Sequence, residues 1–214
     1  MTKSDKKIMY FTTLVTLSPI ILGVFYYEDL PAKMAIHFGI NNTPDGFASK
    51  NVALFVLPLL LGGIQIFSCV VNDRKKNSNM PQPKFETLVK WVIPIISIVV
   101  YGVTLAVGLG KDLDIRKIVI FLIGLIVVVI GNYLPKLSST YLTTPQPGYH
   151  LGDGIADVEI KKIYNRKTGY LFVISGLMML VSIFLSEKVS IVALALLIVG
   201  SIGLGIYYRF IYKK

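Results

Sequence analysis

Six stretches of the 214-residue sequence contain no Asp, Glu, Lys or Arg, and each is 17 to 21 residues long. They cover residues 8–27, 51–71, 91–110, 118–134, 168–185 and 189–208. A helix rises about 1.5 Å per residue, so each stretch approaches the length needed to cross a hydrocarbon core of about 30 Å. A backbone inside lipid has no water partners, and a helix satisfies its own polar groups. The sequence therefore predicts an all-α, polytopic membrane helix bundle with six transmembrane helices.

The basic residues predict which way these helices run. With the N-terminus inside, 16 of the 22 Lys and Arg residues fall on the cytoplasmic side and 6 on the outer side. Because cytoplasmic loops are enriched in Lys and Arg, both termini are predicted in the cytoplasm. The net charge of +10 requires no nucleic acid, since basic residues beside a membrane meet anionic headgroups. The lipid bilayer is the first expected partner.

The predicted spans fall into two halves, which we expect to be an N-terminal membrane domain, 1–110, and a C-terminal one, 111–214. An outer loop, 28–50, joins the first two spans, and a long inner loop, 135–167, joins the fourth and fifth. Each span of the first half contains one proline, whereas the last three spans contain none. A proline removes a backbone hydrogen bond and kinks a helix. Such kinks can serve gating, but a structural role is favoured because prolines are common in membrane helices.

Small residues predict where helices pack closely. Gly102, Ala106 and Gly110 are spaced four apart, and Gly124 and Gly131 share a face at heptad spacing. Both patterns are typical of faces on which a neighbouring backbone approaches. Packing within the chain is favoured for them over a homodimer seam.

Motifs for catalysis or metal binding are missing from the sequence. The two histidines, His37 and His150, are predicted on opposite sides of the membrane, so they cannot share a metal ion. Cys69 is the single cysteine and is interpreted as a small apolar residue. No ionisable residue falls inside a predicted span, which counts against proton-coupled transport. We expect a protein that is not an enzyme and has no catalytic residues, no metal site and no cofactor.

Two loop segments are more specific than the spans. The outer loop combines Leu30-Pro31, a His37-Phe38 step, Pro44-Asp45 and Ser49-Lys50, and the fourth span closes on Gly131-Asn132-Tyr133-Leu134-Pro135-Lys136. The fifth span opens on Gly169-Tyr170-Leu171. Together these segments resemble the SdpI-type immunity proteins, bacterial multi-pass membrane proteins with an N-terminal domain of unknown function. The sequence departs from that family in the inner loop, where residues 143–147 lack the usual arginine and tryptophan.

The resemblance implies a protein of the bacterial cell membrane that gives resistance to a toxic peptide or bacteriocin. The expected toxin-binding residues lie in the outer loop: Met34, Ile36, His37, Phe38, Pro44, Asp45 and Lys50. The family also implies a signalling role, in which a small winged-helix repressor is held at the cytoplasmic face. The candidates for that contact are Asn132, Tyr133, Pro135, Lys136, Lys161, Lys162 and Arg166.

Alternatives remain open at this stage. Residues 157–167 read as an amphipathic helix, and resting on anionic lipid is favoured over docking a repressor. Asn132 is interpreted first as a helix cap or a bond across to the fifth span. The whole chain could instead export a small solute or a peptide, or serve as a non-catalytic accessory subunit in envelope-stress signalling. Export would need a polar path, for which Gln65, Ser68, Thr104 and Asn132 are the available material.

Overall fold

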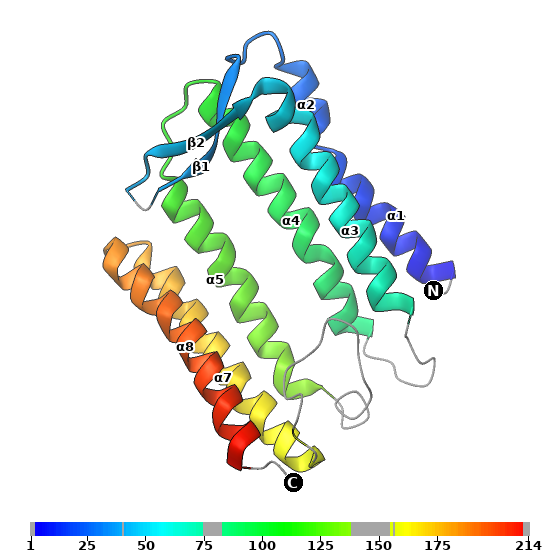
Figure 1. The fold of residues 1–214 in the computed structure, drawn as a ribbon, viewed down its shortest axis with the longest axis vertical. Helices are drawn as coiled ribbons and strands as arrows, with labels where there is room; N and C mark the ends of the chain where they lie inside the picture. Colours follow the sequence, from blue (N-terminus) through cyan, green and yellow to red (C-terminus); the bar gives the residue numbers. More distant parts are fainter. Residues whose placement is uncertain (1–2, 40, 75–82, 138–154, 156, 212–214) are drawn as a thin grey trace. The chain divides into compact units, whose positions relative to one another are not determined.

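A computed structural model of the chain describes residues 3–39, 41–74, 83–137, 155 and 157–211 (Figure 1). Five helical stretches are long and apolar enough to cross a membrane: Lys3–Phe25, Val52–Asp73, Lys84–Gly108, Ile115–Lys136 and Glu187–Ile211. The fifth predicted span, 168–185, lies in helix α7 (Val158–Ser182), whose first ten residues include five charged ones. Because α7 ends at Ser182, its charge-free part is shorter than the predicted stretch 168–185. The all-α polytopic bundle is confirmed, with its fifth span shorter than expected.

The chain folds as two compact units, Met1–Lys76 with Glu86–Arg116 and Asn77–Phe85 with Lys117–Lys214. The first unit is built from α1 (Lys3–Leu17), α2 (Ile20–Phe25), β1 (Lys33–Phe38), β2 (Pro44–Ser49), the π-helix η1 (Val52–Val56), α3 (Leu57–Arg74) and most of α4 (Pro83–Gly108). The second is built from most of α5 (Ile115–Tyr133), the 3₁₀ turn η2 (Leu134–Lys136), α7 and α8 (Glu187–Ile211).

The first proline separates α1 from α2. Pro19 has no N–H to donate to the carbonyl of Val15, its partner in a continuous helix. The hydroxyl of Ser18 donates to that carbonyl instead, at 2.9 Å. The break is therefore satisfied locally by the neighbouring side chain.

The second proline follows the π-helix η1, and its freed carbonyl is satisfied from another helix. In a regular helix Pro58 would bond to the carbonyl of Leu54, and here the Tyr101 hydroxyl of α4 donates to it at 3.3 Å. The ring reaches that position because the residue beside it is glycine. A Cβ on Gly23 would lie 1.8 Å from the Tyr101 oxygen.

The third proline, Pro94, lies inside α4 and frees the carbonyl of Lys90. The Gln65 amide of α3 donates to this carbonyl at 2.9 Å and to the Thr12 hydroxyl of α1 at 2.8 Å. Gln65 is 1% exposed, and an unpaired amide at such a place would cost free energy. One buried side chain thus joins α1, α3 and α4 and completes the third proline site.

A two-stranded antiparallel hairpin, β1–β2, closes the end of the first unit opposite the N-terminus (Figure 1). In the sequence, apolar residues alternate over 34–38, which indicates a short strand or a segment lying in the membrane interface. The structure has the strand β1 there. The hairpin packs on a core cluster formed by Leu30, Met34, Ala53, Leu54, Tyr101 and Leu105. Met34 Cε and Leu30 Cδ2 reach within 3 Å of where a Cβ would stand on Gly108. The glycine at the end of α4 therefore makes room for the hairpin.

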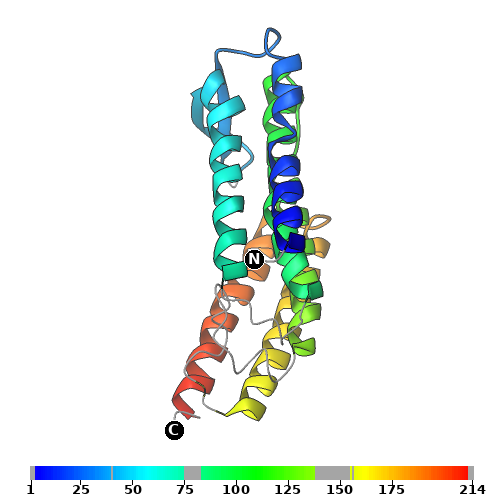
Figure 2. The same cartoon turned by 90° about the vertical axis from the view of Figure 1, so that its right-hand side faces the viewer.

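In the second unit, α5 and α7 cross antiparallel through two pairs of glycines. A Cβ on Gly131 would lie 2.9 Å from the Gly169 carbonyl, and one on Gly124 would lie 3.1 Å from the Gly176 carbonyl. Both helices use heptad spacing, so the contacts recur on one face of each. The predicted close packing at Gly124 and Gly131 is confirmed. Helix α8 turns back along α7, as both views show (Figures 1 and 2).

For the other predicted glycine face, at Gly102 and Gly110, the prediction of close packing within the chain is wrong. A Cβ on Gly102 would meet no atom within 4 Å, so no neighbouring backbone approaches it among the described residues. Gly110 has a different task, because its φ of +79° ends α4 in the left-handed region. Its N–H donates to the Val107 carbonyl and that of Lys111 to the Ala106 carbonyl, both at 2.9 Å. This is a Schellman cap, in which glycine is favoured.

Candidate functional site

The outer hairpin is irregular where the candidate residues gather. The register pairs Lys33 with Ser49, Met34 with Ala48, Ala35 with Phe47, His37 with Gly46 and Phe38 with Pro44. Ile36 and Asp45 have no partner in this register, and each interrupts the two-residue alternation of the strand. The irregularity explains why Ile36 is 38% exposed although Met34, two residues earlier, is 1% exposed. The simple alternation expected from the sequence is broken here.

Apolar and polar groups are exposed together on the hairpin. Phe47 is 59% exposed. Nδ1 of His37 and Oδ1 of Asp45 are 2.5 Å apart, and these side chains are 72% and 51% exposed. An exposed pair of this kind adds little to stability. Ile36, Phe47 and this pair are thus exposed side chains of the same hairpin.

The remaining candidates of this loop hold the hairpin in place. Met34 is buried in the core cluster and is not available at the surface. The Lys50 ammonium donates to the carbonyls of Tyr27 and Leu30, at 2.8 and 3.1 Å, and lies 4.1 Å from the centre of the Tyr27 ring. Phe38 is half-buried at the far end of the strand pair. These residues make the hairpin a fixed platform.

Asn42, which the sequence analysis did not single out, fixes the tip of the hairpin. Its φ is +64°, a conformation that Asn tolerates better than most residues. Its amide nitrogen donates to the Leu113 carbonyl at 2.9 Å, and its oxygen accepts from the Ile115 N–H at 2.7 Å. The latter bond caps the first residue of α5 from a loop 73 positions away. The turn segment Asn41-Asn42-Thr43 was the available sequence signal, but its partner was not predictable.

The inner end of α5 carries four of the signalling candidates. The helix ends at Tyr133 and continues as η2, because Pro135 cannot extend the backbone ladder. Lys136 donates to the Asn132 side-chain oxygen at 3.3 Å and lies 5.4 Å from the centre of the Tyr133 ring. Asn132 is exposed. Its side-chain oxygen accepts from Lys136 in the next turn, where a helix cap or a bond across to the next helix was expected.

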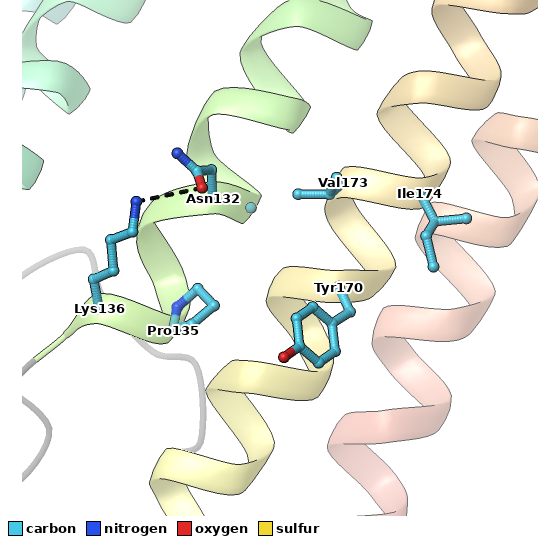
Figure 3. A pocket seen from close by; sticks show the side chains of 7 residues that line it. Asn132, Pro135, Lys136, Tyr170, Val173 and Ile174 are labelled. Atoms are coloured by element: carbon cyan, nitrogen blue, oxygen red, sulfur yellow. Dashed lines mark hydrogen bonds between the residues drawn. The ribbon is translucent and has the colours of Figure 1, made fainter.

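These residues border a pocket of about 430 Å³ between α5 and α7 (Figure 3). It is lined by Gly131, Asn132, Pro135, Lys136, Tyr170, Val173 and Ile174. The walls are mostly carbon, with the Tyr170 hydroxyl between the helices and the Asn132 and Lys136 side chains on the side of α5 away from α7 (Figure 3). The glycine crossing explains its place, since Gly131 contributes no side chain to fill it. Both halves of the predicted motif, at 131–136 and at 169–174, therefore meet in one cavity.

The other signalling candidates lie in the first three turns of α7. Asp157 caps this helix by accepting from the N–H groups of Glu159 and Ile160, at 2.7 and 3.1 Å. Lys162 pairs with Glu159 at 2.7 Å, and Arg166 is exposed. Lys161 is half-buried. Residues 138–154, with His150 and the divergent segment 143–147, lie outside the described residues.

Part of the apolar face of this segment packs on the neighbouring helix α8. Tyr164 is 3% exposed and packs on α8, where its ring centre lies 5.5 Å from that of Tyr208. Ile160 and Leu204 complete the same cluster. The segment is amphipathic as predicted, and α8 covers part of its apolar face.

The structure also reveals a buried ionic cluster that the sequence analysis missed. The Lys90 ammonium lies 2.7 and 3.0 Å from the two carboxylate oxygens of Asp73, and 3.8 Å from Oδ1 of Asp5. The three residues are 5%, 2% and 4% exposed. They come from α4, α3 and α1, next to the Gln65 bonds. The available signal was that all three flank predicted spans on the same side.

The fold and these sites define the class as a multi-pass membrane protein. The family profile described as a domain of unknown function, DUF1648, matches residues 14–62, from α1 through the hairpin into α3. This domain is found in membrane proteins. No curated protein and no solved structure matches the chain significantly.

Proposed function

We propose that this chain is an SdpI-type immunity protein of the bacterial cell membrane that protects the cell from a toxic peptide. The observation that carries the proposal is the hairpin, which is anchored by Met34 and Lys50 yet exposes His37, Asp45 and Phe47 together. The matched domain, 14–62, includes this hairpin. An amphipathic peptide arriving at the outer membrane face would find apolar area and charge side by side.

The hairpin suits such a ligand because it is already rigid. Binding to a fixed surface avoids the ordering cost that a mobile loop would pay. Burying exposed apolar area contributes about 25 cal/mol per Å², so Phe47 and Ile36 can anchor an apolar side chain or an acyl tail. The His37 and Asp45 side chains offer a donor and an acceptor at the edge of that apolar area.

The test is survival of a sensitive bacterium that expresses the chain, measured against a panel of membrane-active peptides and bacteriocins. We expect specific protection, and we expect Phe47→Ala or His37→Ala to reduce it at least tenfold while protein levels hold. Phe121→Ala is the matched control, since Phe121 is 54% exposed but lies within α5. If Phe47→Ala protects as well as the wild type, recognition does not use the hairpin.

A second role, signalling to a winged-helix repressor, is proposed for the cytoplasmic face. The exposed Arg166 and the Lys162 side chain offer positive charge at the start of α7. Charge reversal at both positions is expected to abolish induction of a reporter operon and to leave protection intact. Loss of both activities together would argue for a general folding defect.

Export of a small solute or peptide, or an accessory role in envelope-stress signalling, is the alternative. Two of the polar side chains that a path would use are engaged: Gln65 with Thr12 and Lys90, and Thr104 with the carbonyl of Val100. Protection that persists after the proton gradient and ATP are depleted would favour binding. Protection that disappears under the same treatment would favour export.

A further inference from the structure

We infer that the pocket between α5 and α7 is a binding site for one acidic glycerophospholipid of the surrounding bilayer. The lipid would place an acyl chain against Pro135, Val173 and Ile174 and its phosphate at Lys136. This inference does not depend on the proposed immunity function. It concerns the inner end of the second unit, whereas immunity is proposed for the hairpin of the first.

The pocket has the composition of a site for an amphiphile. Its walls are carbon and the Tyr170 hydroxyl lies between the two helices. The Lys136 ammonium and the Asn132 amide lie at its border, on the side of α5 away from α7 (Figure 3). Lys136 and Asn132 lie in consecutive turns at the end of α5. A ligand with a long apolar part and one anionic end matches this order of groups.

The Lys136 ammonium can change its hydrogen-bond partner. The bond from Lys136 to Asn132 is 3.3 Å long, beyond the usual range for N–H···O bonds. A lysine ammonium binds phosphate as a compact point charge with three donors. Turning it from the neutral Asn132 oxygen to a phosphate would replace a weak bond with a charge-assisted one. The Asn132 amide N–H groups could then donate to the same phosphate.

The depth of the pocket favours lipid over a water-soluble ligand. The apolar stretch Ile115–Lys136 is long enough to cross a membrane, which places Pro135 and Lys136 of η2 at the depth of the headgroups. The α7 wall is open, since Tyr170 and Ile174 are each 54% exposed. Among apolar helices, such an opening admits acyl chains more readily than a charged solute. Tyrosine is also enriched at this depth, with its ring in the apolar layer and its hydroxyl at the headgroups.

The experiment uses the full chain, reconstituted in bilayers of equimolar phosphatidylglycerol and phosphatidylcholine and examined by native mass spectrometry. We expect the lipid that remains bound to be enriched about fivefold in phosphatidylglycerol, which corresponds to about 1 kcal/mol for one lysine beside anionic lipid. Lys136→Gln is expected to remove this enrichment. Lys162→Gln is the matched control and should retain it, because Lys162 pairs with Glu159 outside the pocket.

A second variant tests the acyl position without changing charge. Ile174→Trp should fill the pocket and lower the total retained lipid while circular dichroism shows unchanged helix content. Equal enrichment in the wild type and Lys136→Gln would overturn the inference. It would also be overturned if glycerol 3-phosphate in solution displaced the bound lipid, which would assign the site to a free phosphate, or if a second copy of the chain occupied the pocket in place of lipid.

Discussion

Replacing Lys90 with methionine should test whether the buried ionic cluster stabilises the first unit. Lys90→Met keeps the length of the side chain and removes its charge. The variant leaves the Asp73 carboxylate without the ammonium 2.7 Å away, and Asp5 without its neighbour at 3.8 Å. Removing one partner of a buried ion pair costs about 3–5 kcal/mol. We expect Lys90→Met to lower the free energy of unfolding by about 3 kcal/mol or more.

The chain offers a natural probe for this measurement. Trp91 is the single tryptophan, lies next to Lys90 and packs edge-on against Phe11 of α1 at 5.9 Å. Denaturant titration in mixed micelles, followed by tryptophan fluorescence, therefore reports the separation of α1 from α4. Lys84→Met is the control, because Lys84 is exposed on the same helix, and should change stability by less than about 0.5 kcal/mol.

A double variant separates the contribution of the ion pair from the cost of burying its members. Asp73→Asn combined with Lys90→Met removes the charges of both partners and should lose less stability than the sum of the single changes. The reasoning is refuted if Lys90→Met unfolds within about 0.5 kcal/mol of the wild type. That result would mean that water or lipid headgroups reach the carboxylates.

Four further substitutions probe helix packing and helix ends. Gly131→Leu should prevent α5 from closing on Gly169 and leave a protease-sensitive chain, whereas Gly102→Leu should accumulate normally. Asp157→Ala removes the cap of α7 and should cost about 1 kcal/mol in a thermal unfolding experiment; an unchanged midpoint would show that the two bonds to Asp157 add nothing. Gly110→Ala forces a side chain into φ +79° and should cost about 1 kcal/mol, measured in the same way.

The spans were predictable because the bilayer imposes a simple rule, but their ends were not. Helix α1 begins at Lys3 and α8 continues to Ile211, beyond the charge-free stretches 8–27 and 189–208. Lysine can extend its charged end to water while its backbone remains helical, so a charge does not mark where a helix stops. Conversely, the charge-free stretch 168–185 extends beyond the end of its helix. Helix α7 ends at Ser182, where the turn into α8 begins.

Side-chain partners on different helices could not be predicted from local sequence patterns. Asp5, Asp73 and Lys90 each look like ordinary flanking charges, and their burial depends on three helix ends meeting.

The outer hairpin was half predictable. Alternation indicated the strand β1, but Pro44-Asp45-Gly46, a turn signal in the sequence, begins β2. The turn lies before it, where the Gly39 N–H donates to the Thr43 carbonyl at 2.9 Å. The irregular register of the hairpin decides which of Ile36 and Met34 faces outward, and alternation carries no information about such a shift.

The three proline sites explain much of the polar chemistry within the first unit. Each freed carbonyl accepts a hydrogen bond from a side chain, namely Ser18, Tyr101 or Gln65. In the apolar layer no water can donate a hydrogen bond to such a carbonyl, so each proline needs a donor at a fixed place. Tyr101 and Gln65, whose polarity would suggest a path through the membrane, are thereby committed to holding bent helices together. The recognition that we propose therefore rests on the hairpin, which exposes Phe47, and on the pocket that Lys136 borders at the end of α5.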